Sequence, residues 1–128
     1  MPGVTFVSLQ YGMKPDDPVL AAVNGRLIVG AEIDALASLD ASAAQVAAMD
    51  LVITVSNTTA HLAGAQGVVV WTLLPEGPGC FWYWLRNRSD TPWYQSMRNF
   101  RQPRRGDWQG AVDAVAQALV EMKPQGRL

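Results

Sequence analysis

The chain has 128 residues, of which 49% are hydrophobic and 16% charged, and its formal net charge is −1 at pH 7. This balance excludes an intrinsically disordered chain, and the length is that of a single domain with its own hydrophobic core. Cys80 is the only cysteine, which excludes an intrachain disulfide and a cysteine-rich zinc site.

Signals for export and membrane insertion are missing from the sequence. The N-terminus has no basic segment followed by a long apolar run, and no apolar run approaches the roughly 20 residues of a membrane span. We therefore expect a cytoplasmic protein without a membrane span.

The first third of the chain predicts two strands with a short helix between them. Residues 4–9 form a β-branched and aromatic run that ends at Gln10-Tyr11-Gly12, as a buried strand entering a loop does. Asp16-Asp17-Pro18 is typical of a helix start, and Asn24-Gly25 is typical of a helix end. Residues 26–29 then predict a second, weaker strand.

The middle of the chain predicts helices alternating with buried strands. Asp40 is a good N-cap for a helix through Met49, and residues 51–55 form the next strand. A helix from about Thr58 stops at Gly67, a residue suited to a left-handed helix end. Residues 68–74 are almost wholly apolar, which indicates a strand buried on both faces.

The last third predicts a turn, an aromatic segment, a strand and a helix. Residues 75–80 are rich in turn residues, and residues 81–85 are too aromatic for an ordinary linker. Residues 97–101 are a candidate edge strand, and Asp107 is the expected N-cap of a final helix. Five apolar residues of this helix recur at helical spacing and are predicted to form its buried face: Trp108, Val112, Val115, Leu119 and Met122.

Strands that alternate with helices predict an α/β fold. We expect residues 1–128 to form one three-layer α/β/α, Rossmann-like domain with a five-stranded, mainly parallel sheet. Ligands of such sheets bind beyond the carboxyl ends of the strands.

The strand over residues 51–55 ends in four consecutive polar side chains, Ser56, Asn57, Thr58 and Thr59, and turns directly into a helix. Helix N-termini direct unpaired N–H groups and a positive dipole end at such a place, which suits a phosphate or diphosphate. A simple N-cap at Ser56 or Asn57 explains one of these residues but not all four.

Two further groups of residues leave alternatives open. His61, the sole histidine, lies one turn into that helix and is either a neutral donor to a ligand or a packed, internally satisfied side chain. Residues 86–105 carry six arginines against Asp90 alone, interleaved with aromatic residues that begin at Trp82. This excess of positive charge is typical of three things: a site for a phosphate-bearing ligand, a nucleic-acid surface, or a solvated face. We expect no nucleic-acid partner, metal site, cofactor or catalytic residue.

Four ordered blocks, together covering nearly the whole chain, resemble one protein family. They are VSLQYG at 7–12, DLVITV at 50–55 with TAHLAGA at 59–65, VWTLLP at 70–75, and DTPWYQSMRNFRQ at 90–102. The chain is similar to the C-terminal, donor-binding half of heptosyltransferase-like GT-B glycosyltransferases, in the bacterial branch often fused to tetratricopeptide repeats.

The resemblance implies a nucleotide-sugar site without a metal, with the diphosphate at the helix N-terminus. Ser56 falls where many members have aspartate, Asn57 and Thr58 continue the phosphate loop, and His61 matches the motif's histidine. The ligand-binding residues expected on this basis are Gln10, Tyr11, Ser56, Asn57, Thr58, Thr59, His61, Pro75 and Trp82.

The resemblance also implies that the chain is incomplete as an enzyme. A GT-B enzyme needs an acceptor domain that supplies the catalytic base, and relatives place one more strand before the strand that begins at Val4. If the gap closes, the strand order becomes 2-1-3-4-5; if not, the edges at Val4 and Leu51 recruit a second copy. We expect weak or vestigial binding of a nucleotide diphosphate sugar and no activity alone. The alternative is a non-catalytic interaction or oligomerisation module that uses the segment 81–105.

Overall fold

The computed structural model describes residues 3–14, 16–29 and 37–122, which form a mixed α/β structure with parallel strands. The chain separates into two compact units, Met1–Ala48 and Met49–Leu128. Each unit is described by itself.

The N-terminal unit contains β1 (Phe6–Ser8), α1 (Pro18–Ala22), β2 (Leu27–Val29) and α2 (Leu39–Ala47). β1 and β2 pair in parallel, with Phe6 opposite Leu27. The predicted start of α1 is confirmed, because the Asp17 carboxylate accepts a hydrogen bond of 2.9 Å from the Val19 N–H. Its predicted end is also confirmed, since Asn24 and Gly25 both have positive φ, at 53° and 76°.

The prediction that Asp40 caps α2 is wrong. Ser38 is the N-cap, and its Oγ accepts a 3.1 Å hydrogen bond from the Ala41 N–H. The extended backbone of Ser38 places its hydroxyl over the first turn, so the helix begins two residues earlier than predicted. Asp40 lies in that first turn, where its negative charge interacts favourably with the positive end of the helix dipole.

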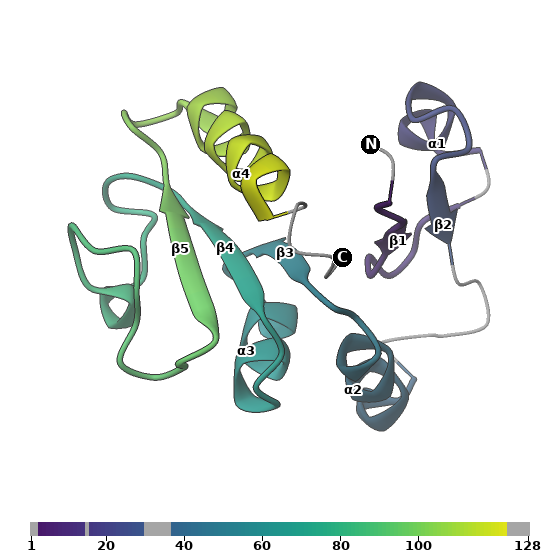
Figure 1. The fold of residues 1–128 in the computed structure, drawn as a ribbon, viewed down its shortest axis with the longest axis horizontal. Helices are drawn as coiled ribbons and strands as arrows, with labels where there is room; N and C mark the ends of the chain where they lie inside the picture. The colour runs from purple at the N-terminus through teal and green to yellow at the C-terminus, as the bar shows by residue number, and fades with distance from the viewer. Residues whose placement is uncertain (1–2, 15, 30–36, 123–128) are drawn as a thin grey trace. The chain divides into compact units, whose positions relative to one another are not determined.

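The C-terminal unit contains one three-stranded parallel sheet in the order β3-β4-β5, drawn in teal to green in Figure 1. Its elements are β3 (Val52–Val55), α3 (Thr58–Ala65), β4 (Val70–Leu74), a 3-10 turn η1 (Trp82–Trp84), β5 (Met97–Arg101) and α4 (Trp108–Met122). All five residues of β4, the central strand, are buried. The predicted burial on both faces is confirmed for residues 70–74, and the strand begins two residues later than predicted.

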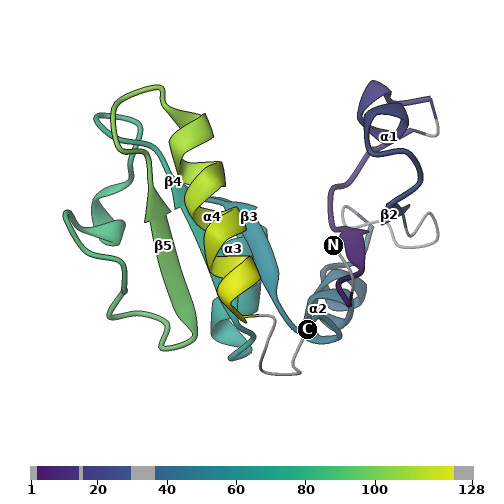
Figure 2. The same cartoon turned by 45° about the horizontal axis from the view of Figure 1, so that its top comes forward.

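Helices cover both faces of this sheet, with α3 on one face and α4 on the other (Figures 1 and 2). Alternate residues of a strand point to opposite faces. Trp71 and Leu73 of β4 accordingly pack with Phe100 and α4. By the same alternation, Val70, Thr72 and Leu74 point to the opposite face. α3 ends as predicted at Gly67, whose φ is 73° and whose N–H donates to the Gly64 carbonyl.

The predicted stripe of α4 is only partly correct. Val115 and Leu119 are buried, but Trp108 and Val112 are 42% and 48% exposed. The face against the sheet is instead completed by Ala111 and Ala118. Small side chains let the helix axis approach the strands closely, so the buried arc centres on the alanines and the larger residues at its flank stay at the surface.

The single five-stranded sheet expected from the sequence is not what the structure shows. The described strands form two parallel sheets, of two and three strands. β1 pairs with β2, and β3 pairs with β4. None of the described helices is long and apolar enough to cross a membrane.

Candidate functional site

Two features meet at one edge of the β3-β4-β5 sheet. The strands are parallel, so Val55, Leu74 and Arg101 end at the same edge. The N-terminus of α3 follows β3 there, and the long connection over residues 75–96 leaves β4 there. Open parallel sheets bind ligands at this edge.

Asn57 is the N-cap of α3. Its Oδ1 accepts hydrogen bonds of 3.1 Å from the Ala60 N–H and of 3.1 Å from Thr54 Oγ1. Thr58, the first helical residue, is exposed, and Thr59 is half-buried. Within the predicted polar run, Asn57 is therefore occupied in starting the helix.

Ser56 holds the aromatic segment against the start of α3. The indole of Trp84, which is fully buried, donates a hydrogen bond of 2.9 Å from Nε1–H to Ser56 Oγ. Buried indole N–H groups usually have such a partner. Ser56 thus supplies an internal acceptor to the connection between β4 and β5.

His61 is packed among aromatic rings. Its Nδ1 lies 2.8 Å from the Tyr94 hydroxyl, and its ring stacks on Trp84 at a centroid distance of 5.3 Å. Tyr94 in turn crosses directly over Gly64 of α3, where a Cβ would lie 2.5 Å from the ring. Of the two roles considered for His61, the geometry favours the internally satisfied side chain.

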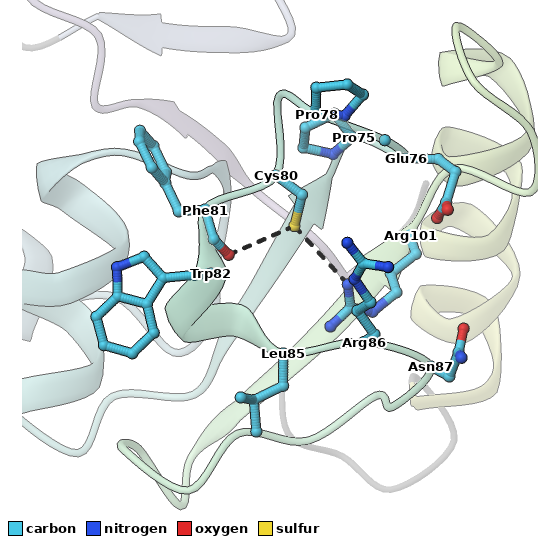
Figure 3. A pocket seen from close by; sticks show the side chains of 11 residues that line it. Pro75, Glu76, Pro78, Cys80, Phe81, Trp82, Leu85, Arg86, Asn87 and Arg101 are labelled. Atoms are coloured by element: carbon cyan, nitrogen blue, oxygen red, sulfur yellow. Dashed lines mark hydrogen bonds between the residues drawn. The ribbon is translucent and has the colours of Figure 1, made fainter.

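A pocket of about 840 Å³ opens beyond the ends of β4 and β5 (Figure 3). Its walls are formed by prolines, exposed aromatic rings, one thiol, one carboxylate and two guanidinium groups. The lining residues are Pro75, Glu76, Gly77, Pro78, Cys80, Phe81, Trp82, Leu85, Arg86, Asn87 and Arg101. The volume falls in the range of about 300–1,000 Å³ that is typical of small-molecule sites.

Arg101, at the end of β5, ties the pocket wall together. Its Nη2 donates a 2.7 Å hydrogen bond to the Trp84 carbonyl, its Nε donates a 3.0 Å bond to the Arg88 carbonyl, and its Nη1 lies 3.8 Å from Cys80 Sγ. Two of its three contacts are therefore with backbone carbonyls, and the third, with the Cys80 sulfur, is drawn in Figure 3.

Arg88 and Asp90 form an ion pair after the pocket segment. Two hydrogen bonds, of 2.6 and 2.8 Å, join the guanidinium to the carboxylate. The hydrogen bond from Arg88 lowers the pKa of Asp90, and the same bond raises that of Arg88.

The predicted site residues fall into three places. Ser56, Asn57, Thr58, Thr59 and His61 lie at the start of α3, and Pro75 and Trp82 line the pocket. Gln10 and Tyr11 follow β1 in the N-terminal unit, where both are exposed.

Sequence reasoning missed the arginines and Cys80 as pocket residues. The excess of arginine over residues 86–105 indicated a possible anion site. The sequence did not show which guanidinium groups face a cavity. In the described ranges, no group of three or more His, Cys, Asp or Glu residues could hold a metal ion.

Comparison with known proteins shows a similarity to part of a longer protein. The chain is 38% identical to Protein FlbA of Caulobacter vibrioides (strain ATCC 19089 / CIP 103742 / CB 15) over 125 residues, which cover 92% of this chain and 20% of FlbA. The chain thus spans about a fifth of the length of that relative. No family model matches the chain, and no solved structure matches it.

Proposed function

We propose that this chain is the nucleotide-sugar-binding domain of a bacterial, cytoplasmic, glycosyltransferase-like protein, incomplete and inactive alone. The observation that carries the proposal is the shared position of two features. The N-terminus of α3 and a pocket with arginine and aromatic walls both lie at the carboxyl edge of one parallel sheet. The sequence blocks that resemble the donor half of GT-B glycosyltransferases support the same assignment.

Each part of such a ligand has a suitable surface. The diphosphate is attracted by the positive end of α3, where Thr58 and Thr59 add hydroxyl groups. The base or sugar stacks on the exposed rings of Phe81 and Trp82. In this arrangement Ser56 and His61 act indirectly, because they hold Trp84 and Tyr94 in place.

We further propose that the two sheets join into one of five strands in the order 2-1-3-4-5. Ile53 and Val55, which share the α4 face of β3, are 38% and 49% exposed in the structure. Parallel sheets are normally covered on both faces, which favours a larger sheet with a further layer over these side chains.

Hydrogen exchange and light scattering test this joined sheet. A monomer in which the amides of β1 and β3 both exchange slowly is the expected result. A dimer would instead indicate that the strand edges pair between copies, and rapid exchange in β1 of a monomer would contradict the five-stranded sheet.

Titration with UDP, GDP and ADP sugars, followed by tryptophan fluorescence, tests the proposed binding. We expect saturable quenching that is lost in a Thr58→Ala/Thr59→Ala variant and kept in Thr5→Ala, a control at an exposed threonine of the N-terminal unit. Circular dichroism checks that the variants fold. No response of the wild-type chain to any nucleotide would overturn the proposal.

That outcome would favour the second candidate, a non-catalytic interaction or oligomerisation module. The observation in its favour is the exposure of three large rings in the segment 81–105. Phe81 is 54%, Trp82 79% and Trp93 55% exposed. Clustered aromatic surface of this kind is enriched where proteins contact partners.

A further inference from the structure

We infer that Arg86 is the anion-binding residue of the pocket, and that Arg101 is the positioning residue that presents it. The inference rests on the proposed function only for the nature of the ligand, a phosphate group of a nucleotide diphosphate. The geometry that points to it is a strained turn held from both sides.

The residues on either side of Arg86 have unusual backbone conformations. Leu85 has φ 61° and ψ −157°, a combination that is essentially restricted to glycine, and Asn87 has φ 55°. Asparagine tolerates positive φ, but a leucine there is strained. Strain of this kind persists only where the surroundings impose it, and it concentrates at ligand-binding sites.

Arg101 makes the contacts that hold the strained turn in its conformation. Its two hydrogen bonds to the carbonyls of Trp84 and Arg88 bracket the 85–87 turn, one on each side. Two of the N–H groups of this guanidinium are therefore bonded to backbone carbonyls. Arg86, in the middle of the turn, also lines the pocket and is exposed (Figure 3).

The charges near the turn single out Arg86 as the group available to a ligand. Arg88 is paired with Asp90, whereas in the described part of the chain Arg86 forms no ion pair. Glu76 is the one carboxylate among the pocket residues, against the two guanidinium groups of Arg86 and Arg101. A guanidinium binds phosphate through two parallel N–H···O bonds, which fits an anionic rather than a neutral occupant.

The aromatic wall narrows the class of ligand. Phe81 and Trp82 border the same pocket and expose large ring surfaces. A flat heterocycle stacks on such rings while its phosphate reaches the arginine. A mononucleotide diphosphate combines these two groups in one small molecule, whereas inorganic pyrophosphate offers only the charge.

The test compares two charge-removing variants of the full chain, Arg86→Ala and Arg104→Ala, by fluorescence titration with UDP and with sodium pyrophosphate. Arg104 is an exposed arginine that is not among the pocket residues, so the change in net charge is matched. Loss of a charge-assisted hydrogen bond corresponds to a Kd for UDP raised about tenfold or more. We expect that effect for Arg86→Ala and less than about a twofold effect for Arg104→Ala. Arg86→Gln serves as a second variant where Arg86→Ala is poorly folded.

The positioning role of Arg101 has its own readout. Arg101→Ala is expected to weaken UDP binding in the wild-type background but to add no further loss in the Arg86→Ala background, because it acts through Arg86. A merely structural effect would lower thermal stability and binding in both backgrounds alike, and that result would overturn the assignment.

The outcomes separate this inference from the proposed function. UDP binding that survives Arg86→Ala but is lost in Thr58→Ala/Thr59→Ala overturns the role of Arg86 and supports the nucleotide site. Pyrophosphate binding that requires Arg86, without any nucleotide binding, supports the anion site and overturns the nucleotide-sugar proposal. No binding of either probe by the wild-type chain overturns both.

Discussion

Trp84 and Ser56 are joined by a 2.9 Å hydrogen bond between the indole Nε1–H and the serine Oγ, across 28 positions of sequence. The bond connects the buried centre of the aromatic segment to the residue that follows β3. It makes the pocket wall and the start of α3 parts of one packed unit.

Ser56→Ala is expected to destabilise the protein by about 1–3 kcal/mol, because it leaves the buried indole N–H without its acceptor. The free energy of unfolding is measured by urea denaturation. In a Trp84→Phe background, which has no indole N–H, the same substitution should cost little. An equal cost in both backgrounds would show that the hydrogen bond is not the cause.

Gly64→Ala is expected to destabilise the protein, although alanine normally favours a helix. A Cβ at this position would lie 2.5 Å from Cγ of Tyr94, which is an overlap with the ring. Overpacking of this kind costs about 1–3 kcal/mol. Thermal unfolding of Gly64→Ala in wild-type and Tyr94→Ala backgrounds gives the measurement.

The Tyr94→Ala background removes the ring, so the helix preference of alanine should then dominate. We expect Gly64→Ala to stabilise that variant by about 0.5–1 kcal/mol. Destabilisation in both backgrounds would contradict the close approach of Tyr94 to α3.

Val115→Ala and Val112→Ala make the same chemical change on two faces of α4. Val115 is 7% exposed and belongs to the core beneath the helix, whereas Val112 is 48% exposed. We expect a loss of about 2 kcal/mol at Val115, from lost burial and a residual cavity, and a change within about 0.5 kcal/mol at Val112. Equal losses in denaturant titrations would indicate that Val112 is buried as well, as the predicted stripe requires.

The Arg88–Asp90 pair predicts a small dependence of stability on acid. The pKa of Asp90 is lowered in the folded protein by the hydrogen bond from Arg88, so the unfolded state binds the proton more readily. The contribution of the pair is present above the ordinary carboxyl pKa and is lost as the pH falls through the folded value. Because both side chains are largely exposed, added salt should weaken it.

NMR titration of the Asp90 side chain measures that pKa, and the unfolding free energy of Asp90→Asn gives the comparison. The difference between wild type and variant should shrink at acid pH. A difference that grows on acidification would contradict the sign.

Much of the fold could be read from local chemistry. Asp17 before Pro18 marks the start of α1, and Gly67 marks the end of α3, because caps and positive φ depend on a few adjacent residues. The apolar run in β4 indicated its central place for a similar reason. These features need no knowledge of distant partners.

The errors arose where tertiary packing decides between similar local choices. Ser38 and Asp40 are both good N-cap residues. The sequence alone does not show which of the two has the extended backbone conformation of an N-cap. In α4, both the large stripe and the alanine stripe have helical spacing, and the close approach to β4 and β5 selects the alanines.

The candidate site shows the same division. Ser56 and His61 were identified as polar residues near the carboxyl edge of a strand, but their partners, Trp84 and Tyr94, come from 28 and 33 residues away. Arg86 and Arg101 belong to one charge cluster in the sequence. Both line the pocket, and only the fold shows that Arg101 donates to backbone carbonyls while Arg86 is exposed.

Gln102, which is buried just after β5, accepts two hydrogen bonds at a single Oε1 atom, of 2.9 Å from the Glu76 N–H and of 3.2 Å from the Gly106 N–H. One amide oxygen thus links Glu76, a residue of the pocket, to Gly106, which lies two residues before α4 begins. A ligand that displaces Glu76 would move its shared acceptor and so change the bond from the Gly106 N–H. The NMR chemical shift of the Gly106 amide proton is therefore expected to change when a ligand occupies the pocket, although Gly106 does not line it.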